Sequence, residues 1–244
     1  MFEPMCISFD CEFVLHHLIP GIGCLTALWI FIAPFKSVRK IDKTDSLDNV
    51  NPFPFPMIMA NCLGWLVYGL LVQDPYVFFP NIVGYQLGVY YTLTSYRVSG
   101  KDFQSRVIQI LVVSSVLVFS GAFVSFIVLN GAYPARTIMG LVCVMILAVF
   151  YSAPLSGFYS VIKNKDASSI DPILAAASLV NGSLWSIYGL ALGDAFIWSP
   201  NLLGVVFCVV QFVLMAVYPN RSPYEPPLLQ GTALQAIDLS DDVL

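Results

Sequence analysis

The sequence predicts an all-α membrane protein of seven transmembrane helices, arranged as two parallel three-helix repeats joined by a linker helix (3+1+3). Three observations support this fold class. The 244-residue chain is 58% hydrophobic and only 11% charged, whereas about 25% charged residues is usual in a soluble domain. It contains seven apolar stretches of about the 20 residues that are needed to cross a bilayer. One motif-rich segment recurs 120 residues further along the chain.

Each apolar stretch is predicted to form one transmembrane helix. The stretches comprise residues 14–35, 54–72, 76–96, 107–129, 137–161, 172–192 and 196–218. The first could be read as a signal peptide, but it lacks a basic n-region and a small-residue cleavage site. Acidic Asp10 and Glu12 precede it instead. We therefore interpret it as a retained helix.

The repeat divides the chain into domains. "WLVYGLLVQDPYVFFPNIVG" begins at Trp65 and "WSIYGLALGDAFIWSPNLLG" at Trp185, and a 24-residue window holds nine identities at a shift of 120. Average residue usage predicts roughly one or two. Three helices per repeat would invert the second repeat, and the motif-free stretch 107–129 is predicted to restore its direction. The predicted domains are residues 1–13, 14–96, 107–129, 137–218 and 219–244.

Basic residues predict the orientation in the membrane. Ten of the eleven Lys and Arg residues fall on one side, and Arg136 stands alone on the other. Because Lys and Arg accumulate on the cytoplasmic side, segment 1–13 is predicted to be extracellular. Residues 219–244 are predicted to form a disordered cytoplasmic tail, since they lack apolar content. A plasma membrane location is favoured, and an organelle membrane stays open.

Composition argues against several classes of protein. No basic patch suggests nucleic-acid binding, and no cysteine spacing suggests a metal site, so no cofactor is predicted. Four cysteines lie within apolar stretches, while Cys6 and Cys11 form either a disulfide or two free thiols. His16 and His17 are interpreted as interfacial. The helices contain no evident nucleophile or acid–base set, so an enzyme is not predicted.

The repeated polar and aromatic residues predict a ligand site between the repeats. A rise of 1.5 Å per residue places the tryptophans and one asparagine pair about 8–10 Å inside the membrane. The second asparagine pair lies one turn away, on the same face as the tryptophans. These residues are Asn81, Asn201, Trp65, Trp185, Asn61 and Asn181. Amides and aromatic faces suit a neutral polyhydroxylated ligand. Hydrogen bonds between helices and anchoring of tryptophan at the interface are the alternatives.

The motifs resemble those of the SWEET (saliva-type) sugar facilitators. The similarity covers roughly residues 14–218 and rests on "AP" at Ala33 and Ala153, "WxxYG" and "PNxxG" in both repeats. It implies that the paired tryptophans and the asparagines of "PNxxG" contact a sugar. It also implies that Asn61, Asn181, Ile30 and Phe150 shape the pocket.

The same resemblance implies moving parts. Prolines act as flexing points, here Pro34, Pro54, Pro154 and Pro172, because proline removes a backbone hydrogen bond. The run "NPFPFP" leaves the choice of Pro54 ambiguous, and Pro172 stands about one residue out of family register. Tyr68 and Asp194 are expected to close an extracellular gate. A solvated loop is the alternative for Asp74 and Asp194.

Charge and size predict the mode of transport. No ionisable residue lies near the middle of a predicted helix, so nothing suggests ion coupling, and passive bidirectional uniport is predicted. Bulky Asn61, Asn181 and Phe150 favour a monosaccharide such as glucose over sucrose. The expected partners are a mono- or disaccharide substrate and the lipid bilayer, with homo-oligomer formation left open. A PQ-loop-type transporter of another small solute and a seven-helix receptor are the alternatives.

Overall fold

The computed structural model describes residues 9–48, 50–131 and 133–218, and within these ranges every regular element is helical. The predicted C-terminal tail, Arg221 and Cys6 lie outside the described residues. Cys11 is disulfide-bonded, so its interpretation as a free thiol is wrong. The four cysteines within the apolar stretches are free thiols.

The first repeat contains one long helical run followed by two further helices. The run is broken at Ala33 and Pro34, after Ile32. It resumes at Phe35 as a helix rich in Lys and Arg. Its parts and the helices that follow are α1 (Phe9–Phe13), η1 (Val14–Leu18), α2 (Ile19–Ile32), α3 (Phe35–Thr44), α4 (Pro54–Val72) and α5 (Pro75–Val98).

The second repeat follows the linker helix and repeats the pattern of the first. A break at Tyr151 separates its first helix into two parts. The elements are α6 (Lys101–Phe123) with η2 (Val124–Val128), which form the linker, then α7 (Tyr133–Phe150), α8 (Ser152–Asn164), α9 (Pro172–Ala191) and α10 (Ala195–Val217).

The segment "KSVRKIDK", residues 36–43, lies between two predicted transmembrane stretches, and the structure shows that it is helical. It lies in α3, where Val38 and Ile41 are buried. Two apolar residues three positions apart share one helix face, so this face packs against the bundle while Lys36, Arg39 and Lys40 remain exposed. The amphipathic pattern therefore continues the helix beyond Pro34.

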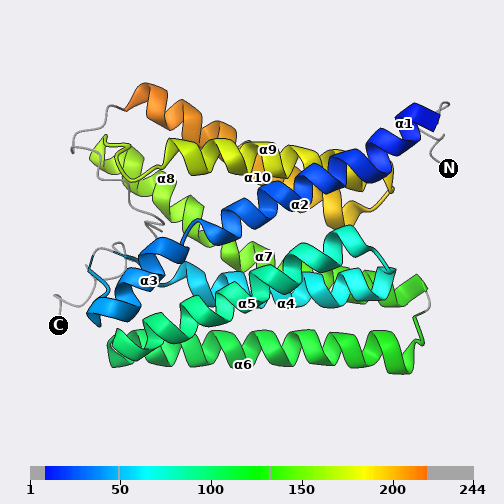
Figure 1. Ribbon diagram of the computed structural model, residues 1–244, viewed down its shortest axis with the longest axis horizontal. Coiled ribbons are helices and arrows are strands. Elements are labelled where there is room, and N and C mark those ends of the chain that lie inside the picture. The colour runs from blue at the N-terminus through cyan, green and yellow to red at the C-terminus, as the bar shows by residue number, and fades with distance from the viewer. Residues whose placement is uncertain (1–8, 49, 132, 219–244) are drawn as a thin grey trace.

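Six helical runs among the described residues are long and apolar enough to cross a membrane. The linker α6–η2 and the runs α1–α3 and α7–α8 are among them. The remaining long helix, α5, has 24 residues and packs along the full length of α4 (Figure 1). It carries more polar side chains, including Asn81, Gln86 and Thr92. With α5 as the seventh crossing, the bundle has the predicted 3+1+3 order.

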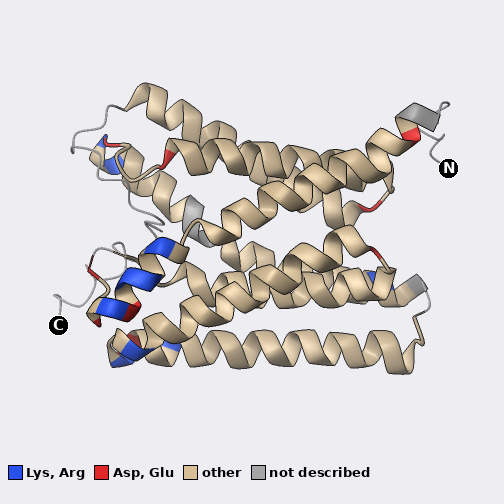
Figure 2. Ribbon diagram, viewed as in Figure 1, with Lys and Arg blue, Asp and Glu red and all other residues tan. Residues whose placement is uncertain are grey.

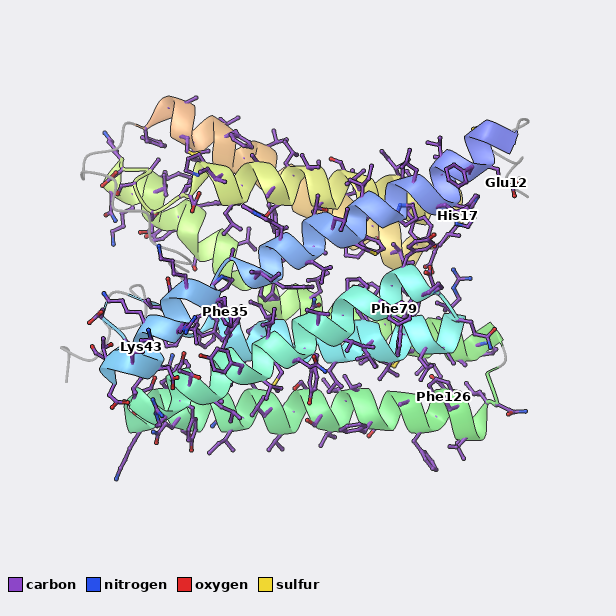
Figure 3. All side chains as sticks on the ribbon, in the orientation of Figure 1. Glu12, His17, Phe35, Lys43, Phe79 and Phe126 are labelled. Carbon is purple, nitrogen blue, oxygen red and sulfur yellow. The ribbon has the colours of Figure 1, made fainter. Side chains whose placement is uncertain are left out.

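The two repeats meet along equivalent surfaces. The first helix of each repeat packs against the second helix of the other: α2 contacts α9, and α4 contacts α7. Within each repeat the second and third helices pair, as α4 with α5 and α9 with α10. The linker α6 lies against α4 and α7, on one side of the bundle (Figure 1). Exposed apolar side chains such as Phe79 cover the outside (Figure 3).

The two ends of the bundle differ in charge. Lys and Arg residues gather where α3 lies, α6 begins and α8 ends (Figure 2). We call this the basic end. Asp74 and Asp194 cap the N-termini of α5 and α10 at the opposite end, which we call the aspartate end. Each carboxylate accepts two backbone N–H groups, which fixes where these helices begin.

Candidate functional site

A cavity lies between the two repeats, beside the predicted binding residues. Its central part, about 120 Å³, is lined by α2, α4, α5, α9 and α10. A larger part of about 410 Å³ shares Asn61, Asn181 and Asn201 with the centre. It extends past Asp171, at the start of α9, and Gln211, toward the basic end. The two parts therefore adjoin one another at these shared residues.

The structure brings all eight predicted substrate-binding residues to this cavity. Both asparagine pairs and the tryptophan pair line the central part: Asn61, Asn181, Trp65, Trp185, Asn81 and Asn201. Ile30 and Phe150 line the larger part. The lining therefore joins side chains 120 residues apart in the sequence, as the repeat predicts.

The asparagine side chains of the third helices each follow a proline and bond to their own helix. Pro80 and Pro200 stand inside α5 and α10, where proline lacks the N–H of a regular helix. The side-chain Nδ2 of Asn81 donates to the carbonyl of Val77 at 2.7 Å. Asn201 Nδ2 donates to Ile197 at 2.8 Å in the same way. Each amide keeps its Oδ1 and a second N–H for a ligand.

The tryptophans are held by the other asparagine pair. Trp65 Nε1 donates to Asn61 Oδ1, and Trp185 Nε1 donates to Asn181 Oδ1, both at 3.2 Å. Residues four apart are neighbours on one helix face, so each bond forms within a single helix. Trp185 also packs on Gly23, where a Cβ would lie 3.3 Å from the indole ring. These contacts set the orientation of the indole rings.

Two tyrosine–aspartate pairs join the repeats at the aspartate end. Tyr68 donates to Asp194 Oδ2 at 2.7 Å, and Tyr188 donates to Asp74 Oδ2 at 2.8 Å. The two bonds are equivalent in the two repeats, because Tyr188 and Asp194 stand 120 positions after Tyr68 and Asp74. Asp194 is only 2% exposed. Tyr68 and Asp194 are thus in contact. Both aspartates stand in the short connections that precede α5 and α10, but Asp194 is buried rather than solvated, and Asp74 is part-buried.

Arg136 strengthens one of these pairs and breaks the symmetry. Its Nη2 lies 2.6 Å from Asp194 Oδ2, and its Nε donates to the Tyr68 hydroxyl at 3.2 Å. In the other pair, the ring of Tyr76 packs edge-on against Tyr188. The Tyr76 hydroxyl lies 3.0 Å from Nδ1 of His17. Sequence reasoning missed Arg136 and the pair of Tyr188 with Asp74; for the latter, the repeat was an available signal.

The predicted hinge prolines fall into two groups. Pro34 lies at the break between α2 and α3, and Pro154 lies in α8 just after the break at Tyr151. A proline cannot bond the carbonyl four residues earlier, and those carbonyls belong to Ile30 and Phe150, at the cavity. Each break therefore adjoins a residue of the cavity wall.

The second group stands where helices begin. Pro54 and Pro172 are the first residues of α4 and α9. This position favours proline, because its missing N–H would have no helical partner. These two prolines do not kink a helix. Any hinge at them would tilt a whole helix about its first turn.

A helical membrane protein with a polar cavity between two repeats has the architecture of a solute transporter. The comparisons identify its family. The profile described as "Sugar efflux transporter for intercellular exchange" matches residues 17–101 and 137–223, two segments that begin 120 residues apart. The chain belongs to this family, the SWEET family of sugar transporters.

Curated relatives from different organisms support the same family assignment. The bidirectional sugar transporter SWEET4 of Oryza sativa is 33% identical over 203 residues, covering 81% of this chain and 77% of the relative. The sugar transporter SWEET1 of Danio rerio is 31% identical, covering 80% and 90%. A solved structure of a eukaryotic SWEET transporter superposes with a TM-score of 0.74 at 22% identity, over 84% of this chain and 97% of that one. The predicted family, helical membrane fold and non-enzymatic class are confirmed.

Proposed function

We propose that this protein is a bidirectional, facilitative uniporter of a monosaccharide such as glucose, working by alternating access. The observation that carries the proposal is a cavity lined by symmetry-related asparagines and tryptophans between the two repeats. It extends to the basic end. The two tyrosine–aspartate pairs join the repeats at the other end. This arrangement suits one of the two states that alternating access requires.

The lining suits a neutral, polyhydroxylated ligand. The central part of the cavity is lined by apolar, aromatic and amide side chains, and no charged residue of the described chain is among them. Asn81 and Asn201 each offer an acceptor oxygen and one N–H, and Asn61 and Asn181 each offer two N–H groups. Several sugar hydroxyls can bond to these groups at once, while the indoles pack on the C–H faces of the ring.

Passive transport is the mode that the charges favour. A proton or ion carrier within the membrane is usually an ionisable side chain. Asp74 and Asp194 are bonded to tyrosine and to helix N-termini at the aspartate end. Asp171 lines the larger part of the cavity near the basic end, where its carboxylate caps the N-terminus of α9. No carboxylate of the described residues lines the central part of the cavity. Sugar would therefore move down its own gradient in either direction.

The small volume of the central part favours a monosaccharide over a disaccharide. This part has a volume of about 120 Å³ and is flanked by the side chains of Asn61 and Asn181. Phe150 narrows the larger part next to it. Alternating access would close the basic end by bending at Pro34 and Pro154 and by tilting α4 and α9 at Pro54 and Pro172. It would open the gate at Tyr68 and Asp194.

We further propose that the protein lies in the plasma membrane with its N-terminus outside. The described Lys and Arg residues, apart from Arg136, gather at the basic end (Figure 2), and such an end faces the cytoplasm. The aspartate end then faces the exterior. Surface labelling of an epitope at the N-terminus in intact cells tests this orientation, and labelling only after permeabilisation would contradict it.

The function is tested by radiolabelled sugar flux in proteoliposomes without an ion gradient. Wild-type protein should equilibrate glucose and move sucrose much more slowly. Asn201→Ala should lose glucose flux, because the cavity loses one amide. As a control, Asn164→Ala removes an exposed amide of α8 and should keep the glucose flux of the wild type. Sucrose flux equal to glucose flux would contradict the preference for a monosaccharide. No flux of either sugar would contradict sugar uniport.

A further inference from the structure

We infer that Thr26 sets the hydrogen-bond polarity of one amide of the sugar site, so that the side chain of Asn181 offers only donors whereas the side chain of Asn61 offers donors and an acceptor. Thr26 is then a specificity-determining residue that fixes which way round a sugar binds. The inference rests on the proposed function, since it assigns an orientation to the proposed substrate.

The chemistry of tryptophan identifies the amide oxygens. An indole Nε1–H is a donor only, so the amide atom that it contacts must be the oxygen. Trp185 contacts Asn181 in this way, and Trp65 contacts Asn61, each at 3.2 Å. In both halves, the amide oxygen therefore points toward its tryptophan.

Thr26 occupies the second lone pair of one of these oxygens. Its Oγ1 lies 2.9 Å from Asn181 Oδ1. An amide oxygen only accepts, so the hydroxyl donates. The carbonyl of Gly23 is 3.0 Å from the same hydroxyl and competes for its single proton. A proton directed wholly at Gly23 would leave two acceptor oxygens 2.9 Å apart, which is unfavourable. With Trp185 and Thr26 both bonded, Asn181 Oδ1 has no lone pair left for a ligand.

The other half has no equivalent of this hydroxyl. The residue 120 positions after Thr26 is Ile146, which is 6% exposed and carries no polar side-chain atom. Among the described residues, Trp65 is the hydrogen-bond donor to Asn61 Oδ1. An amide oxygen accepts two hydrogen bonds. Asn61 therefore keeps one lone pair, and its side chain lines the cavity.

The remaining amides do not distinguish the two halves. Asn81 and Asn201 make equivalent bonds to the carbonyls of Val77 and Ile197. The difference between Asn61 and Asn181 is therefore the feature that orients a ligand. A sugar oxygen beside Asn181 must act as an acceptor, as the ring oxygen does. A hydroxyl beside Asn61 can donate.

Competition by modified glucoses tests the assignment. Fluorine in place of a hydroxyl keeps a weak acceptor and removes the donor, while the deoxy sugar removes both. We measure inhibition of labelled glucose uptake by the full monofluoro and monodeoxy series. In the wild type, at least one position should show deoxy inhibition about 3- to 10-fold weaker than fluoro inhibition, the effect of one hydrogen bond. Thr26→Val should reduce this ratio to within about 2-fold, since Asn181 then accepts and both orientations bind.

Controls separate the hydroxyl from folding. Thr26→Ser keeps the donor and should keep the wild-type pattern. Ser183→Ala removes a hydroxyl of α9 that donates to the carbonyl of Leu179 in the same helix. This variant should also keep the wild-type inhibition pattern. Thr26→Ala repeats the test if Thr26→Val assembles poorly. An unchanged pattern in both Thr26→Val and Thr26→Ala, with glucose uptake intact, would overturn the inference alone. Failure of the wild type to move glucose would overturn the proposed function.

Discussion

Removing the Tyr68 hydroxyl should open the aspartate end. In the structure, Tyr68 donates to the buried carboxylate of Asp194 at 2.7 Å, and this bond joins the two repeats. A hydrogen bond to a charged group contributes about 1.5–3 kcal/mol. If opening breaks it, Tyr68→Phe favours the state open at the aspartate end by about 10- to 150-fold, since about 1.4 kcal/mol is tenfold.

The labelling rate of a buried cysteine measures this shift. Ala27 lines the central cavity and is 8% exposed, so Ala27→Cys reports on access to it. A membrane-impermeant thiol reagent is added on the side that the aspartate end faces. Tyr68→Phe should raise the labelling rate toward the calculated range. Tyr188→Phe should act in the same direction, because Tyr188 bonds Asp74 in the equivalent way.

A control removes a tyrosine hydroxyl away from this end. Tyr159 lies on α8 and is 61% exposed, so Tyr159→Phe should leave the labelling rate of Ala27→Cys unchanged. The reasoning fails if Tyr68→Phe labels no faster than the parent protein. It also fails if Tyr159→Phe accelerates labelling as much as Tyr68→Phe does.

Three further outcomes are expected. Arg136→Gln removes the ion pair with Asp194 and should also speed labelling of the cysteine reporter. Because the side chain of Arg136 is 38% exposed, its loss should cost less than the about 3–5 kcal/mol of breaking a fully buried ion pair. Slower labelling would contradict a role of Arg136 in closing this end. Gly189→Ala places a Cβ 2.5 Å from the backbone nitrogen of Trp198 and should lower stability in detergent by about 1–3 kcal/mol. Gly21→Ala, with open space around it, should not lower stability. Equal melting temperatures of the two variants would refute the close packing of α9 on α10 at Gly189. Asn81→Ala should reduce glucose flux as Asn201→Ala does, and normal flux would exclude an equivalent role.

The sequence could predict whatever the repeat encodes. Identical residues 120 positions apart fold into equivalent helices, so their side chains meet at the symmetry axis. This reasoning placed Asn81 and Asn201 opposite one another and led to the cavity. The fold class followed from the apolar stretches and the number of helices in each repeat. Tyr68 and Asp194 came from family resemblance, and the structure brings them into contact.

Features that break the symmetry could not be predicted in this way. Arg136 and Thr26 have no chemical equivalents at positions 120 residues away, which are His16 and Ile146. Their roles depend on which side chain of the other repeat lies within hydrogen-bond distance, and a repeat pattern carries no such information. The helix α3 could not be predicted from the apolar stretches for a different reason: residues 36–43 are rich in charge, and the burial of Val38 and Ile41 decides their helical structure.

The final distribution of glucose across proteoliposome membranes tests the central claim most directly. The claim is that sugar equilibrates through the cavity between the repeats without coupling to an ion. Wild-type protein should bring the inside and outside concentrations to the same value, with or without an imposed proton gradient, and Asn201→Ala should slow the approach to it. Accumulation of glucose above the outside concentration when a proton gradient is imposed would contradict uniport.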